Sequence, residues 1–310
     1  MIDPDYFGCS AKLTYSETRS LVEASGSGSV DDFSRFGFAN EFVASVDRIS
    51  RCASDWAKFA NIAVNHALAD IEVAFAIPLH AVICFEFGPD ANMADRSVAA
   101  QSFRQAVLQR GMTLGKCHSA LSNDPTSVVI SVIGTIQDQI LHTPVEGKVF
   151  LNRPLGLFKL HYMEEMGLLE TESTALSAIF QPRFVPEALK NVAVLSDVSG
   201  HGLGGSLASL AHRFSLDLDI SIHSRLAAAS EVLMTDIDCL QNARETYGSY
   251  LEVDNDSAWP LISLRETAGP MLALVESSFD IEPGSFGTGY CLSIGTFRRG
   301  SGKVIVRWQE

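Results

Sequence analysis

Four aspartates stand at positions where a carboxylate could hold a metal ion. Asp32 follows a polar segment, Asp47 is expected to end a strand, and Asp197 separates an apolar strand from a glycine-rich turn. Asp70 lies in the apolar stretch Ala67-Leu-Ala-Asp-Ile71, where a carboxylate needs a partner. Mg²⁺ prefers hard oxygen ligands and often bridges one or two carboxylates to substrate phosphates. A helix-cap or turn role is the alternative for most aspartates in loops.

A glycine-rich segment at residues 196–205 is the second candidate. Gly200 and Gly202 lie where the predicted strand leads into a predicted helix. Backbone N–H groups at such a junction can approach an anion closely. The segment lacks the Gly-Lys-Ser/Thr ending of a Walker A loop. A tight strand-to-helix turn without a ligand is the alternative.

Two further pairs of residues could take part in chemistry. Cys9 and Lys12 are three residues apart, so the lysine could lower the thiol pKa and supply charge to a phosphoryl group. An ordinary N-terminal tail is the alternative. His118 and Ser119 follow Gly115 in a predicted loop, where the histidine could be a ligand, a phosphate donor or a plain loop residue.

The elements that must position these residues alternate between strands and helices. Apolar and β-branched runs predict strands, and apolar residues at helical spacing predict helices. The predicted strands are residues 41–46, 79–87, 127–136, 148–152, 192–195, 216–222, 271–276, 291–297 and 303–308. The predicted helices are residues 56–74, 98–110 and 206–214, with another after Gly156. This mixture predicts an α/β fold with helices covering sheets.

Composition limits the class of protein. The chain has 310 residues, of which 46% are hydrophobic and 19% charged, and this suits two domains with cores of their own. A net charge of -14 disfavours nucleic acid as a partner. We expect neither a signal peptide nor a membrane span. Six scattered cysteines without a CxxC pair indicate reduced thiols and a cytoplasmic location.

The candidate residues fall in an order that resembles selenophosphate synthetase (selenide, water dikinase), in the aminoimidazole ribonucleotide synthetase-like superfamily. The resemblance spans nearly the whole chain, and its most specific motif is D-V-(T/S)-G-x-G-L, matched from Asp197 to Leu203. Further family motifs are C-x-x-K, D-D-A-A-V, T-D-F-F, N-A-L-S-D-I-Y-A, G-G-H-S and T-K-P-L-G, matched at residues 9–12, 31–35, 46–49, 66–73, 116–119 and 152–156.

The resemblance implies a two-domain α/β (α+β) fold with mixed sheets covered by helices. It implies a mobile segment at 1–30, an ATP- and metal-binding domain at 31–147 and a second domain at 148–310, with N-terminal domains pairing in a homodimer. The implied reaction uses ATP, selenide and water and gives selenophosphate, AMP and phosphate. The implied roles are Mg²⁺ binding by Asp32, Asp47, Asp70 and Asp197, phosphate binding by His118, Ser119, Gly200 and Gly202, and catalysis by Cys9 and Lys12.

The chain also departs from the family pattern. His66 replaces the asparagine four residues before the helix aspartate, and Lys116 and Cys117 replace two glycines. Residues 264–270 replace D-P-Q-T-S-G-G. These changes concern the acceptor more than ATP. The alternatives are therefore a diverged kinase of the same superfamily, acting on a carbonyl, amide or sulfur acceptor and releasing ADP, and a non-catalytic nucleotide-binding relative.

Overall fold

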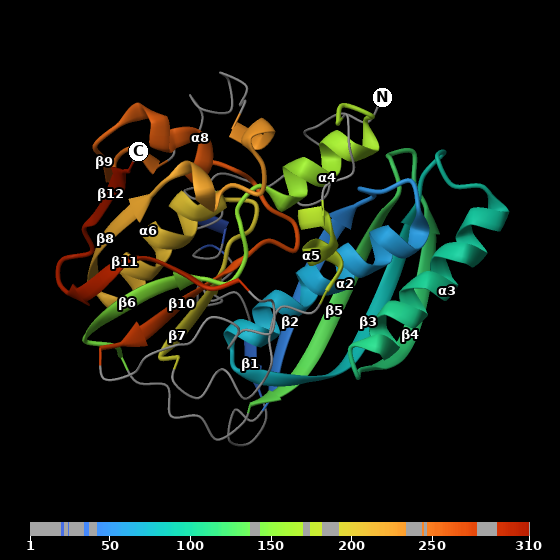
Figure 1. The fold of residues 1–310 in the computed structure, drawn as a ribbon. Helices are drawn as coiled ribbons and strands as arrows, with labels where there is room; N and C mark the ends of the chain where they lie inside the picture. The colour runs from blue at the N-terminus through green and yellow to red at the C-terminus, as the bar shows by residue number, and fades with distance from the viewer. Residues whose placement is uncertain are drawn as a thin grey trace.

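The structure is a computed structural model that describes residues 20–21, 24, 34–36, 42–136, 143–169, 174–181, 192–233, 244, 247–277 and 290–309. The candidates Cys9, Lys12 and Asp32 lie outside these residues. Two sheets, each with its own helices, lie side by side (Figure 1). No helix among the described residues is long and apolar enough to cross a bilayer.

The first sheet has five strands. In spatial order they are β1 (Ser34–Phe36), β2 (Phe42–Ser50), β5 (Ser127–Ile136), β3 (Ala76–Phe87) and β4 (Thr113–Leu121). The strands β3 and β4 are parallel, and the other neighbours are antiparallel. Helices α2 (Trp56–Val73) and α3 (Met93–Gln109) cover one face of this sheet (Figure 1).

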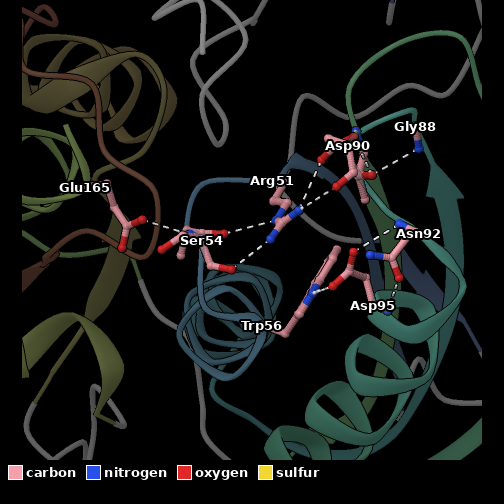
Figure 2. Close-up of polar contacts among 10 residues, drawn as sticks. Arg51, Ser54, Trp56, Gly88, Asp90, Asn92, Asp95 and Glu165 are labelled. Carbon is pink, nitrogen blue, oxygen red and sulfur yellow. Dashed lines mark hydrogen bonds and ion pairs between the residues drawn. The ribbon is translucent and has the colours of Figure 1, made fainter. Parts of the chain in front are cut away.

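Local hydrogen bonds fix where these two helices begin. The carboxylate of Asp55 accepts the N–H of Lys58 at 2.8 Å, which caps α2. Asn92 and Asp95 exchange side-chain and backbone hydrogen bonds at the start of α3, as Figure 2 shows. The indole of Trp56 donates to Asp95 at 3.5 Å, so the two helix starts are joined.

The second sheet has seven strands. In spatial order they are β7 (Val194–Asp197), β10 (Met271–Glu276), β6 (Glu146–Leu151), β11 (Leu292–Arg299), β8 (Leu216–Ile222), β12 (Val304–Trp308) and β9 (Leu251–Val253). The strand β12 runs parallel to β8 and β9, and the other pairs are antiparallel. Among the described residues of this half, the helices are α4 (Leu157–Glu165), α5 (Ser177–Phe180), α6 (Gly202–Phe214) and α8 (Trp259–Ile262).

Most of the predicted strands and helices are present, with three corrections. Asp47 lies inside β2 and does not end a strand. The predicted loop around His118 is wrong, because β4 runs through it as an edge strand. The strand predicted from Lys148 begins earlier, at Glu146. The domain boundary at residue 147 stays a prediction.

The apolar core of the first half continues into the second. Phe103 of α3 is fully buried and meets Phe59 and Phe85 edge-on, with ring centroids 5.3 Å apart in both pairs. The same cluster of buried side chains includes Phe158 of α4 and Leu195 of β7. The two sheets are therefore joined by a shared apolar contact.

We expect Phe103→Ala to lower the free energy of unfolding by about 3–5 kcal/mol, because it removes a buried ring with two aromatic neighbours and leaves a cavity. Val98→Ala on the same helix is the control, since Val98 is 48% exposed. It should change stability by about 0.5 kcal/mol or less. Urea denaturation measures both variants, and equal losses would contradict the assignment of Phe103 to the core.

Candidate functional site

Two of the candidate aspartates lie where β2 packs against α2. Alternate residues of β2 point toward the helix, so Ser45 is buried and the side chain of Asp47 is 16% exposed, while Val46 between them is 64% exposed. His66 and Asp70 are one turn apart on α2. The hydroxyl of Ser45 donates to the Asp70 carboxylate. His66 Nε2 lies 3.6 Å from Asp47 Oδ1.

His66 connects this pair to the second half of the chain. The backbone N–H of Ala268 donates to His66 Nδ1 at 3.3 Å. Because an N–H group can only donate, Nδ1 accepts, and this geometry assigns the neutral ring's proton to Nε2. That N–H faces Asp47. His66 is 3% exposed, and its buried ring lies between Asp47 and the backbone of Ala268.

Asp197 approaches the same region from the second sheet. It is the last residue of β7, is 9% exposed, and pairs with Met271 of β10. Val198 then donates its N–H to the carbonyl of Pro270 at 2.9 Å. The segment from Ala268 to Met271 thus contacts both His66 and the end of β7, and α2 also packs on β7.

Helix α2, which carries Asp70, therefore packs on both the strand that carries Asp47 and the strand that ends at Asp197. Carboxylates gathered at one contact repel each other unless a cation or hydrogen-bond donors offset their charge. Ser45 supplies a donor to Asp70, as the sequence pattern predicted for a carboxylate in an apolar stretch. Hard carboxylate oxygens suit Mg²⁺, so the donor set fits the ion that the sequence predicts.

The glycines of the turn have a steric role. Gly202 has a φ of +65°, and a side-chain carbon there would lie 2.8 Å from the carbonyl oxygens of Ile262 and Leu264. Its N–H donates to Ser199 at 2.8 Å. Gly200 is buried in the same turn. Close packing explains why Gly202 is glycine, and anion binding is not needed to explain it.

His118 and Ser119 lie apart from the aspartates. Both are exposed on β4, at the edge of the first sheet. The strands β5 and β3 separate β4 from β2, so three strand spacings, about 14 Å, lie between them. Within one chain these two residues and Asp47 are too far apart to share a metal ion.

A buried charged pair at the start of α4 was not predicted from the sequence. Glu266 is 1% exposed and accepts the N–H groups of Gly156 and Phe158 at the start of that helix. Arg153, also fully buried, donates to the carbonyl of Gln181 at 2.7 Å. Burial raises the pKa of Glu266 to about 7, although the two N–H donors and Arg153 act in the opposite direction.

This raised pKa predicts a pH dependence of stability. Between the unfolded pKa near 4.5 and a folded pKa of about 7, the folded chain holds a proton that the unfolded chain releases. The contribution of Glu266 to stability is thus fully present below pH 4.5 and is lost as the pH rises to 7, by about 3 kcal/mol. We expect Glu266→Gln to flatten the slope of unfolding free energy between pH 5 and 7.

Urea denaturation at several pH values measures this slope. Glu231→Gln is the control, because Glu231 is exposed and should leave the slope unchanged. If Glu266→Gln keeps the slope of the unsubstituted chain, the carboxyl of Glu266 does not titrate in this range.

Sequence comparison finds distant relatives. No protein-family model matches the chain. Selenide, water dikinase of Shewanella sp. (strain ANA-3) is 23% identical over 276 residues, which cover 83% of this chain and 77% of the relative. Selenide, water dikinase of Pasteurella multocida (strain Pm70) is 22% identical over 286 residues, which cover 86% and 81%.

Structural comparison shows the fold. Thiamine monophosphate kinase from Aquifex aeolicus matches with a TM-score of 0.66 at 15% identity, covering 95% of this chain and 98% of the other. AaThiL complexed with AMPPCP and TMP gives 0.66 at 16%, covering 95% and 93%. Hydrogenase maturation protein HypE in complex with ATP gives 0.56 at 14%, covering 96% and 90%. The predicted aminoimidazole ribonucleotide synthetase-like fold, with two mixed sheets covered by helices, is confirmed.

Proposed function

We propose that this chain is an ATP- and Mg²⁺-dependent phosphotransferase whose phosphoryl acceptor is selenide, and that its products are selenophosphate, AMP and phosphate. The observation that supports the proposal is that α2, which carries Asp70, packs both on β2, which carries Asp47, and on β7, which ends at Asp197. Two curated relatives are selenide, water dikinases. Two structural neighbours hold AMPPCP and ATP.

In this proposal the aspartates bind and orient the nucleotide. Mg²⁺, when bound, neutralises charge on the phosphates, which is the main requirement of phosphoryl transfer. Asp47 and Asp70 would hold it from the first half, Asp197 from the second, and Asp32 from the segment before β1. His66 would act as a positioning residue, because it holds Asp47 against Ala268.

The N-terminal segment would bring the acceptor. Lys12 would stabilise the transferred phosphoryl group, and Cys9 would orient the selenide. Closure of residues 1–30 would exclude water during the first step. The phosphate-binding roles of His118, Ser119, Gly200 and Gly202 stay predictions, and the strand spacing places the first two farthest from the aspartates.

A homodimer is part of the proposal. Val46 and Val82 are 64% and 37% exposed, and both lie opposite Ser131 of β5, so they form a row across three strands. Ile77 is 41% exposed. Since α2 and α3 cover the opposite face (Figure 1), this apolar face is suited to contact a second copy.

A kinase that releases ADP is the second candidate. The observation in its favour is the TM-score of 0.66 with thiamine monophosphate kinase. The replacement of the D-P-Q-T-S-G-G motif at residues 264–270 also leaves the acceptor open. The two candidates share the aspartate site and differ in the nucleotide product, so one experiment separates them.

Phosphorus NMR of ATP incubated with the protein, Mg²⁺ and selenide tests the proposal. We expect ATP to be converted to AMP, phosphate and selenophosphate. Asp197→Asn should reduce turnover by at least about 100-fold, because it removes a metal-binding charge. Asp219→Asn is the control, since the Asp219 side chain is 49% exposed on β8 and should leave turnover unchanged.

Each outcome of this experiment has a consequence. ADP without selenophosphate supports the second candidate. Normal turnover in a folded Asp197→Asn variant removes Asp197 from the site. ATP binding without turnover, with any acceptor, would mean that the chain is a nucleotide-binding relative and not an enzyme.

Cys9→Ser separates acceptor chemistry from ATP binding. We expect the variant to bind ATP as the unsubstituted chain does and to lose selenide-dependent turnover, because it lacks the thiol that is proposed to orient the selenide. Cys117→Ser is the matched control, since Cys117 is an exposed free thiol on β4. Calorimetry measures binding and phosphorus NMR measures turnover, and equal rates in both variants would make Cys9 a bystander.

A further inference from the structure

Helix α4 carries three residues of metal-ligand type that the proposed function does not use. His161, Glu164 and Glu165 are three and four residues apart, so they share one face of the helix. One ligand atom of each lies within 4.8 Å of the other two. His161 is fully buried, and the two glutamates are partly exposed at the surface.

The ring of His161 is oriented as a ligand would be. Its Nε2 lies 2.9 Å from the carbonyl oxygen of Cys52. A carbonyl can only accept, so Nε2 carries the proton and Nδ1 of the neutral ring presents its lone pair. Nδ1 lies 3.8 Å from Glu164 Oε2, which is longer than a hydrogen bond.

The carboxylates are held by the segment between β2 and α2. The N–H of Ser54 donates to Glu165 Oε2 at 2.7 Å, and Arg51 in turn donates to the carbonyl of Ser54, as Figure 2 shows. Lys58 Nζ lies 3.4 Å from Glu164 Oε2, and its side chain is 42% exposed. Such an exposed ion pair offsets little of the carboxylate charge.

We propose that His161 Nδ1, Glu164 and Glu165 bind a divalent transition-metal ion of the Zn²⁺ type on the face of α4 that meets the segment between β2 and α2. One imidazole nitrogen and two carboxylates form a three-ligand set that zinc accepts, with a water in the fourth position. The hydrogen bond from Nε2 to a backbone carbonyl is the outer contact that metal-binding histidines usually make. Imidazole nitrogen disfavours Mg²⁺, which prefers oxygen ligands.

The distances between the three ligand atoms are such that zinc binding requires only small movements of the side chains. Zinc–ligand distances of about 2.0–2.2 Å place neighbouring tetrahedral ligands about 3.4 Å apart. The separation of 3.8 Å between Nδ1 and Glu164 Oε2 closes with a small change in a partly exposed side chain. The site is separate from the aspartates, because Lys58 and His66 are eight residues, or about 12 Å, apart along α2.

Crystals of the full chain soaked in Zn²⁺ with excess Mg²⁺ test this proposal. We expect an anomalous peak at the zinc edge between the three side chains. Equilibrium dialysis against Zn²⁺, also with excess Mg²⁺, should show one zinc ion per chain that is lost, or bound at least tenfold more weakly, in the double variant Glu164→Gln/Glu165→Gln. Zn²⁺ should raise the Tm of the unsubstituted chain and not that of this variant.

Two further variants keep the test decisive. His161→Gln should also lose the peak, but it changes a buried residue. The double variant Glu164→Gln/Glu165→Gln is therefore the main test, since the amide oxygen at position 165 can still accept the N–H of Ser54 and the local structure is kept. His212→Gln is the control, because His212 is exposed on α6, and it should keep both the peak and the Tm shift. Absence of the peak, or unchanged zinc affinity in the folded double variant, would overturn the proposal.

Discussion

The packing of α2 against two sheets at once is the constraint on which the rest of the structure depends. One side of the helix meets β2, β3 and β5, and another meets β7 and α5. A helix buried on so many sides leaves little room for polar groups, and each one must be hydrogen-bonded. Asn65 shows the consequence, because it donates to the carbonyls of Ile179 and Gln181 and accepts from Arg110. Its polar atoms join the halves of the chain that the apolar core also joins.

The same constraint explains why the carboxylates of the site are held firmly. A carboxylate beside a packed helix would normally be paired with a cation or lost. Asp70 has the Ser45 hydroxyl, and Asp47 faces a histidine whose other nitrogen is fixed by Ala268. The contact with Ser45 is a hydrogen bond, and the contact with His66, at 3.6 Å, is a close approach without one. A site that keeps negative charge in a protected contact is preorganised for a cation, which is the arrangement that phosphoryl transfer requires.

Sequence predicted the elements that bury apolar residues and missed those that do not. The strand β5 was predicted at its observed bounds, because its β-branched residues are packed between two neighbouring strands. The strand β4 gave no signal, since an exposed edge strand carrying Lys116, Cys117 and His118 has no apolar alternation. The structure confirms that Asp70 has a hydrogen-bond partner, but the sequence could not show that this partner is Ser45. That contact depends on how β2 and α2 are placed in space.

Charged residues whose partners are distant in the sequence could not be predicted either. Glu266 and Arg153 are far apart in the sequence, and their burial follows from how α4 meets the loop before β10. His161 is similar, because its orienting carbonyl belongs to Cys52 in the other half. The contact between His161 and Cys52 lies just before the start of α2, whereas His66 lies nearly three turns into the helix. The two halves are thus joined at several points along α2, by hydrogen bonds as well as by the shared apolar core.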